Sequence, residues 1–248
     1  MKRLWPLIAL GVGAFVLLAL VTFPASVVLS RLGSAGLVAS GVSGSIWNGK
    51  AQVLQVRGTN IGSVEWDLHV LPLFTLHLNA DVKVSRTDGF ATAALSVGPG
   101  GKVTLKGLTA SLPLSAINFP QLSGWVGQLN AKFARLTLDD GWPTEVDGTL
   151  DAVDVTGPPR RPANMGTYRV AFDPTASTAE LLQGAITDAG NGPLEINGTV
   201  RLKADRSYEV DALVAARPGA PQNMARTLEY LGPPDPQGRR QFSMAGAL

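Results

Sequence analysis

Hydrophobic and polar residues alternate along most of the chain after residue 40. Between Val64 and Val84 apolar residues occupy every second position, with a single interruption at Leu71-Pro72. Successive side chains of a β-strand point to opposite faces of a sheet, so this alternation predicts half-buried strands. Because Pro72 has no backbone N–H to offer a neighbouring strand, we expect an edge, a bulge or a break between two strands there.

The same alternation predicts further strands toward the C-terminus. They cover residues 91–97, 102–108, 129–138, 146–155, 168–172, 196–204, 208–216 and 241–248. The phase of the alternation slips by one position after Phe133 and after Ala152, which predicts β-bulges. Asp88-Gly89 and Asp205-Arg206 separate neighbouring strands, and Asp-Gly is typical of a two-residue hairpin turn.

One helix is predicted among these strands, over Ala220–Leu231. Its apolar residues Met224, Leu228 and Leu231 recur at helical spacing, and it ends before Pro233-Pro234. Many short strands with Gly- and Pro-rich turns predict a mainly β fold. We expect a curved antiparallel sheet or a sandwich-like domain, with one short helix near the C-terminus.

The first thirty residues have a different composition. Leu4 to Ser30 is an uncharged run of 27 residues, rich in Leu, Val, Ala, Ile and Phe. About 20 helical residues span a bilayer core, so the run predicts a single transmembrane helix. Lys2 and Arg3 precede it, and basic residues favour the cytoplasmic side. The rest of the chain is then exported, which in a bacterium means the periplasm.

A cleaved signal peptide is the competing interpretation of this N-terminus. Signal peptides end at a site of small residues, but Phe23 stands where a small residue is needed and the apolar run continues to Leu29. These features favour a retained anchor. We therefore expect a single-pass inner-membrane protein with an anchor at 1–30, a linker of small residues at 31–40 and a periplasmic β-rich domain at 41–248.

Charge and cysteine content exclude several classes of function. The formal net charge of +2 equals the contribution of Lys2 and Arg3, because the other 19 basic residues balance 19 acidic ones. No basic patch is left to bind nucleic acid. The chain has no cysteine, so it has neither a disulfide nor a thiol nucleophile nor a zinc site of the cysteine type.

The chain offers few candidates for catalysis or metal binding. His69 and His77 lie on the polar face of the alternating stretch, about 27 Å apart if one strand carries both, without a third ligand nearby. The pairs Asp139-Asp140 and Asp151/Asp154 are explained by turns and strand surfaces. No Gly-x-Ser-x-Gly, Walker or His-Glu-x-x-His motif is present. We therefore predict a protein without enzymatic activity, cofactor or metal.

Three segments together resemble the N subunit family of the bacterial type II secretion system. They are the basic start with its single anchor, "SGSIWNGKAQV" followed by "VEWDLHVLPL", and the C-terminal "LEYLGPPDPQGRRQFSMAGAL". The resemblance implies a non-enzymatic inner-membrane component for the export of folded periplasmic proteins. Its expected partners are the inner-membrane platform and the outer-membrane secretin, whose connection it would help to assemble or stabilise.

A second resemblance leads to a different function. A periplasmic sheet with one apolar face behind a single helix is similar to lipid-handling proteins of the AsmA-like or lipopolysaccharide-bridge type. In those proteins the apolar face would be a groove for acyl chains, since each uncovered Val, Leu or Phe forgoes roughly 1.5–3 kcal/mol of burial. Lipid is the expected partner under this alternative.

Strand edges are the expected contact sites for protein partners. An unpaired edge presents a row of backbone donors and acceptors that another strand can use. The last predicted strand, residues 241–248, is the most exposed candidate. We predict that it contacts a partner through Gln241, Phe242, Met244 and Leu248.

Overall fold

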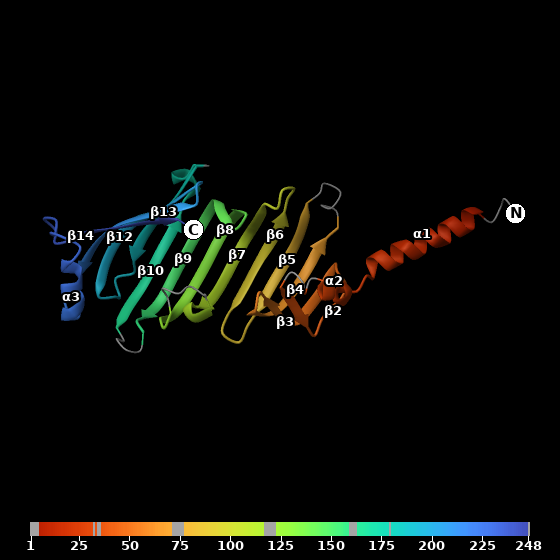
Figure 1. Cartoon of the computed structure of the whole chain (residues 1–248), viewed down its shortest axis with the longest axis horizontal. Coiled ribbons are helices and arrows are strands. Elements are labelled where there is room, and N and C mark those ends of the chain that lie inside the picture. Colours follow the sequence, from red (N-terminus) through yellow and green to blue (C-terminus); the bar gives the residue numbers. More distant parts are fainter. Residues whose placement is uncertain are drawn as a thin grey trace. The chain divides into compact units, whose positions relative to one another are not determined.

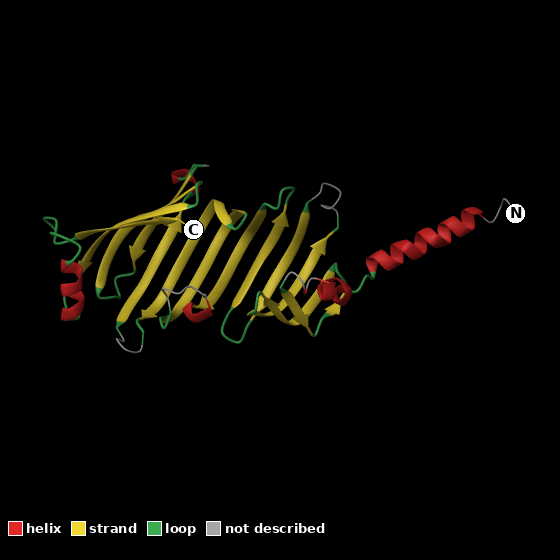
Figure 2. Cartoon of the chain, viewed as in Figure 1, coloured by secondary structure: helices red, strands yellow, loops and turns green. Residues whose placement is uncertain are grey.

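The structure is a computed structural model that describes residues 5–31, 33, 36–70, 77–116, 123–158, 163–178 and 180–247. Strands make up most of it, with a long N-terminal helix and a few short helices (Figure 2). The prediction of a mainly β fold is therefore confirmed. The chain divides into two compact units, Met1–Thr87 and Asp88–Leu248, so the boundary falls inside the β-rich region predicted over 41–248.

The uncharged N-terminal run forms two helices, α1 (Trp5–Val21) and α2 (Ala25–Arg31). The turn between them contacts Ser45 and Ile46 of the same unit. The carbonyl of Phe23 accepts a hydrogen bond from the Ile46 N–H at 3.0 Å, Pro24 forms a β-bridge with Ser45, and Ala25 is only 2% exposed. The segment that begins α2 is therefore part of the folded unit.

Among the helices that the structure describes, none has both the length and the apolar character needed to cross a membrane. Lys2 and Arg3, the predicted cytoplasmic residues, lie outside the described residues.

The first unit contains five antiparallel strands (Figure 1). Its strands are β1 (Leu37–Ser40), β2 (Ser43–Gly44), β3 (Asn48–Val56), β4 (Thr59–His69) and β5 (Leu78–Ser85). They are arranged in the order β1-β3-β4-β5, and β2 pairs with the start of β3. The long alternating stretch thus yields two strands, which confirms a break near Pro72, itself outside the described residues. Residues 37–40 of the predicted linker form β1.

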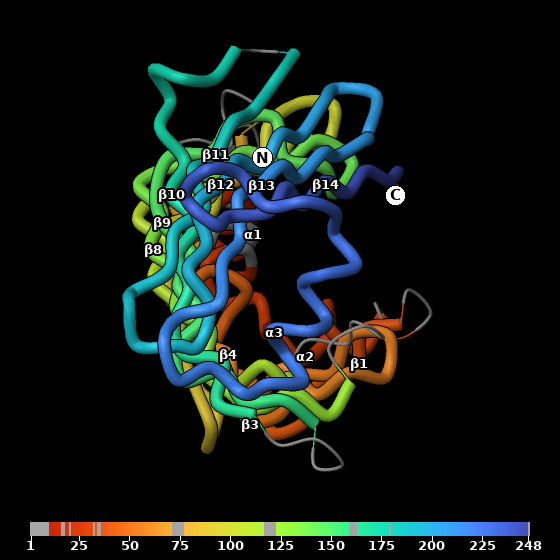
Figure 3. Tube along the Cα trace, turned by 90° about the vertical axis from the view of Figure 1, so that its left-hand side faces the viewer, coloured from red at the N-terminus to blue at the C-terminus, as the bar shows by residue number. Residues whose placement is uncertain are grey.

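The second unit is a series of antiparallel strands in which each strand pairs with the next along the chain. The strands are β6 (Phe90–Val97), β7 (Val103–Pro113), β8 (Val126–Asp139), β9 (Trp142–Thr156), β10 (Asn164–Phe172), β11 (Leu181–Asp188), β12 (Leu194–Lys203), β13 (Ser207–Ala216) and β14 (Arg240–Ala247). Helix α3 (Gln222–Glu229) connects β13 to β14. The sheet is curved, and α3 lies on the inner side of the curve (Figure 3).

One face of this sheet is apolar. Residues paired across an antiparallel ladder point to the same side, and one such row runs through Leu150, Val170, Ile186, Gly198, Ala212 and Phe242. The residues that pack against α3 lie on this face, so it is the inner face of the curve. The apolar inner face comprises Leu108, Ala131, Phe133, Leu136, Val146, Leu150, Val170, Phe172, Leu182, Ile186, Leu194, Ile196, Val200, Leu202, Val210, Ala212, Val214, Phe242 and Met244.

The outer face is polar and carries ion pairs between neighbouring strands. They include Arg169–Asp151 at 2.5 Å and Arg201–Asp211 at 2.6 Å. No second sheet covers either face in the described parts of the unit, and none of the large side chains described there is completely buried. The unit is therefore a single layer with a partly covered apolar face.

Phenylalanine rings on the inner face lie over glycines of the next strand. Phe133 faces Gly148, and Phe172 faces Gly184, where an added Cβ would lie 2.9 Å from the ring. Strand β11 was not predicted because Gly184 interrupts the apolar alternation at the position that the Phe172 ring fills. Large apolar side chains on one strand thus fill the space that a glycine leaves on the neighbouring strand.

Two hairpin turns far apart in the sequence are joined at one rim of the curved sheet. The indole N–H of Trp142, after the β8–β9 turn, donates to the carbonyl of Lys203 at the end of β12 over 2.9 Å. Arg206 in the β12–β13 turn forms an ion pair with Asp140 at 2.6 Å. These contacts bridge over β10 and β11, so they help to hold the curvature.

Most of the local predictions are confirmed. The bulges after Phe133 and near Ala152 appear as register shifts of β8 and β9. The C-terminal helix is shorter than predicted, because α3 ends at Glu229. The prediction of a two-residue turn at Asp88-Gly89 is wrong. Residues 86–89 separate β5 from β6, and neither Asp88 nor Gly89 has a positive φ.

Candidate functional site

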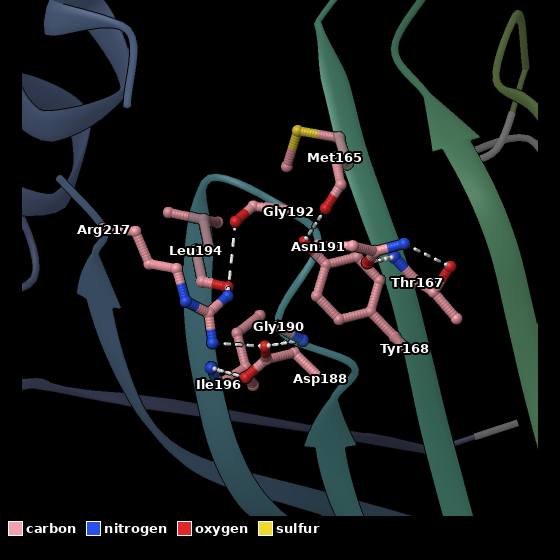
Figure 4. A network of polar contacts seen from close by, with 10 residues as sticks. All are labelled: Met165, Thr167, Tyr168, Asp188, Gly190, Asn191, Gly192, Leu194, Ile196 and Arg217. Atoms are coloured by element: carbon pink, nitrogen blue, oxygen red, sulfur yellow. Dashed lines mark hydrogen bonds and ion pairs between the residues drawn. The ribbon is translucent and has the colours of Figure 1, made fainter. Parts of the chain in front are cut away.

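A charged cluster lies at one end of the apolar inner face, where β11, β12 and β13 end or begin (Figure 4). Asp188 is the last residue of β11, and its position continues the apolar row that contains Ile196 and Val214. Arg217 follows the end of β13. Their side chains form an ion pair at 2.6 Å with 7% and 26% exposure, respectively. This pair is the most buried of the ion pairs described in the structure.

Backbone groups complete the coordination of both charges. Asp188 accepts hydrogen bonds from the N–H groups of Gly190 and Ile196, each at 2.8 Å. Arg217 donates to the carbonyls of Leu194 at 2.7 Å and Gly192 at 3.2 Å. The pair therefore closes the β11–β12 turn and attaches it to the segment that leads into α3.

These contacts keep Asp188 ionised. Burial by itself raises the pKa of its carboxyl group. The hydrogen bonds from Ile196, Arg217 and Gly190, together with the charge of Arg217, outweigh burial and lower this pKa below its ordinary value. A carboxylate can lie on an apolar face only because it is paired and fully hydrogen-bonded.

The same turn is attached to β10 by neutral groups. Asn191 accepts a hydrogen bond from the Thr167 N–H at 2.9 Å and donates to its hydroxyl at 3.2 Å. The hydroxyl of Tyr168 donates to the Met165 carbonyl at 2.6 Å. Burial, together with the charge of Asp188, raises the pKa of Tyr168 and keeps it a neutral donor. The cluster thus connects β10, β11, β12 and β13.

A hollow of about 720 Å³ opens beside the cluster. Its polar side chains are Asn164, Asn191, Arg217 and Asn223, and the remainder of its lining is Ala, Gly and Pro. No carboxylate, hydroxyl or imidazole is part of this lining, so the hollow supplies neither a nucleophile nor a general base. Its polar groups can form hydrogen bonds, and Arg217 adds a positive charge that is paired with Asp188.

The two histidines lie at the same end of the first unit's sheet. His69 ends β4 opposite Asn79 of β5, and His77 immediately precedes β5. The separation of about 27 Å that one continuous strand would give does not apply, because the chain reverses between the two histidines. His69 contacts the carboxylate of Asp81 at 3.1 Å, with both side chains exposed. In the described part of the chain, no group of three or more His, Asp and Glu side chains is placed to hold a metal ion.

The carboxylate pairs considered from the sequence do not share a site. Asp140 and Gly141 have positive φ angles of 45° and 78° and form a tight turn between β8 and β9. Asp151 is paired with Arg169, and Asp154 lies at the bulge of β9 with a positive φ of 51°. The predicted turn at Asp140-Gly141 is confirmed. Asp140, Asp151 and Asp154 thus belong to a turn, an ion pair and a bulge, respectively.

Strand β14 contains three of the four predicted contact residues. Gln241 and Met244 are exposed, Phe242 is half-buried, and Leu248 lies outside the described residues. In the described structure β14 pairs with β13 along its whole length and with no other strand. Among the described residues its second edge is therefore unpaired.

The charged cluster was not predicted from the sequence. Asp188 and Arg217 are 29 residues apart, and no local pattern links them. The one signal was the turn sequence Asp-Ala-Gly-Asn-Gly at 188–192, in which an Asp side chain can bind the following backbone N–H groups. Recognising that turn would also have identified β11 before it.

The chain was compared with known proteins. A family described as "Type II secretion system (T2SS), protein N" matches residues 35–243. "Type II secretion system protein N" of Vibrio cholerae is 26% identical over 238 residues, which cover 92% of this chain and 92% of that protein. The protein of the same name from Aeromonas hydrophila is 24% identical over 259 residues, covering both chains completely. No solved structure matches.

The Asp188–Arg217 pair should stabilise the second unit. In Asp188→Asn the side-chain shape is kept but Arg217 loses its counter-charge. We expect the free energy of unfolding to fall by about 2–3 kcal/mol at neutral pH, less than the roughly 3–5 kcal/mol typical of fully buried pairs, because Arg217 is partly exposed. Because the pKa of Asp188 is lowered, its contribution is present above the ordinary value of 3.8 and is lost as the pH falls through the folded-state pKa.

Thermal unfolding of both proteins between pH 7 and pH 2 measures this effect. The difference in Tm should be constant near neutral pH and should shrink below about pH 4. Asp154→Asn is the matched control, since Asp154 is exposed and Asn tolerates its positive φ of 51°. Equal Tm values for Asp188→Asn and wild type at pH 7 would contradict the role of the cluster.

Proposed function

The chain belongs to the type II secretion system protein N family, and on this premise we propose that it is a non-enzymatic component that supports the connection between the inner-membrane platform and the outer-membrane secretin. The observation that carries this proposal is a body of paired strands in which β14, among the described residues, pairs with β13 alone. Such a body suits contact with other subunits of the system.

We place the protein in the inner membrane as a single-pass protein, with its bulk in the periplasm. The support is the uncharged run Leu4–Ser30, preceded by Lys2 and Arg3 and containing the apolar helix α1. Phe23 and Pro24 bond to the first unit, so cleavage of a signal peptide there would remove part of the fold. This favours retention of the N-terminal segment.

Contact with a partner is proposed to run through β14, by addition of a strand to its free edge. The contact residues are Gln241, Phe242 and Met244, with Leu248 following the described strand. Residues 241–247 contain no charge and no proline, the features by which proteins usually block an edge. Met244 is 45% exposed and lies at the margin of the inner face.

Secretion in the source bacterium tests this role. Deleting the gene should leave exported proteins in the periplasm. Re-expression of the Met244→Lys variant places a charge on the edge strand. The amount of exported protein outside the cells should then fall at least tenfold, although the variant itself is present at its normal level. Val126→Lys is the control, because Val126 is 64% exposed at the start of β8. Normal secretion after deletion would contradict the system role, and normal secretion with Met244→Lys would contradict the edge contact.

Binding of lipid is a second candidate function, favoured by the incomplete cover of the inner face. The backbone groups of β7–β13 are used in the strand ladders, and the inner-face side chains between the two rims are apolar. An extended peptide lying there would leave its own N–H and C=O groups unpaired, whereas an acyl chain has none. The ligand under this candidate is the acyl chain of a glycerophospholipid.

Lipid content of the purified full-length protein tests this candidate. Ile186→Lys puts a charge on the inner face, and Thr187→Lys puts it on the outer face of the same strand. Mass spectrometry should find at least fivefold less phospholipid with Ile186→Lys than with Thr187→Lys, with circular dichroism verifying that both fold. Lipid bound to α1 is common to both variants, so equal amounts would contradict an acyl-chain groove.

A further inference from the structure

The free edge of β14 is unusually regular. Eight consecutive residue pairs join β14 to β13, from Ser207–Ala247 to Val214–Arg240, without a register shift. The edge strand carries one charged residue, Arg240 at its beginning, and no proline or bulge interrupts it. A straight, uncharged edge is the form that pairs most readily with another strand.

We infer that the strand added to β14 is β14 of a second copy of this chain, in antiparallel orientation about a two-fold axis at Ser243. The inference rests on the proposed role of β14 as a contact edge and names the partner. Two-fold symmetric dimers are the commonest homo-oligomers, and they need a self-complementary surface. The sequence of β14 provides one.

The register about Ser243 follows from the side-chain pattern. It places Phe242 opposite Met244 of the other copy, twice, and both pairs lie on the inner-face side. A thioether against an aromatic ring is a favourable contact. Gln241 and Ala245 of opposite copies meet on the outer face, and Ser243 meets Ser243 of the other copy.

The charges are also compatible with this register. Arg240 of one copy lies opposite Gly246 of the other, so no like charges meet. Gly246 is covered by the Tyr208 ring of β13, whose hydroxyl oxygen would lie 2.6 Å from an added Cβ. Within its own chain the guanidinium of Arg240 donates to the carbonyl of Gly232. Because the paired residues point to the same side, the apolar inner faces of the two copies continue each other.

Cysteine cross-linking of the full chain in membranes tests the inference, since the natural chain has no cysteine. Residues opposite each other in an antiparallel pair have Cα atoms about 4.5–5.5 Å apart, within reach of a disulfide. Ser243→Cys should therefore give a covalent dimer under mild oxidation. Gln241→Cys and Ala245→Cys are the matched controls. In this register each of these residues lies about 13 Å along the strand from the same residue of the other copy.

We expect at least tenfold more dimer from Ser243→Cys than from either control alone. Co-expression of Gln241→Cys with Ala245→Cys should restore the cross-link. Ser243 donates a hydrogen bond to Asp211 at 2.8 Å, so thermal unfolding of Ser243→Cys verifies that the fold is kept. A Ser243→Cys protein that stays monomeric, or that cross-links to a different protein, would overturn the inference.

Secretion measured in the same strains separates this inference from the proposed function. If Ser243→Cys stays monomeric in a strain that requires the protein for secretion, self-pairing is contradicted and the secretion role is kept. If the dimer cross-links but the strain secretes normally without the gene, the secretion role is contradicted and self-pairing is kept.

Discussion

The second unit depends on one constraint: a sheet in a single layer has an apolar face that no second layer covers. The strand ladders satisfy the backbone, but burial of apolar side chains is the main favourable term in folding, and here it is incomplete. The curve of the sheet brings apolar rows toward each other. Phe133 and Phe172 lie over glycines of neighbouring strands, and α3 covers the end of the face with Met224 and Leu228. The remaining stability must come from contacts that hold the curve.

Those contacts lie at the two rims of the inner face. At one rim the Trp142 N–H binds the Lys203 carbonyl and joins two hairpins. At the other, Asp188 and Arg217 connect the β11–β12 turn to the segment before α3. Polar groups thus fix both ends of the apolar surface, and Asp188 is buried there together with its counter-charge. The same arrangement leaves β14 with one free edge, which links the fold to the proposed contacts between subunits.

Alternation along the chain was sufficient to predict most strands, because each strand has one apolar and one polar face. It failed at β11, where Gly184 accepts a ring from Phe172 and the apolar partner belongs to another strand. It also could not give the Asp188–Arg217 pair, whose members meet only when β11 and β13 are placed in the same sheet. The Asp88-Gly89 turn shows that turn chemistry does not by itself fix loop length. β14 was predicted as a strand, but its free edge is a property of the strand order.

The central claim is that β11 lies in a single-layer sheet with one inner and one outer face, although apolar and polar residues do not alternate along its sequence as they do along the neighbouring strands. The reactivity of single cysteines at three consecutive positions measures it directly in the full-length protein. With a water-soluble maleimide, Ala185→Cys and Thr187→Cys, both exposed, should react at least tenfold faster than Ile186→Cys on the inner face. Equal rates at the three positions, or the fastest rate at 186, would contradict the account.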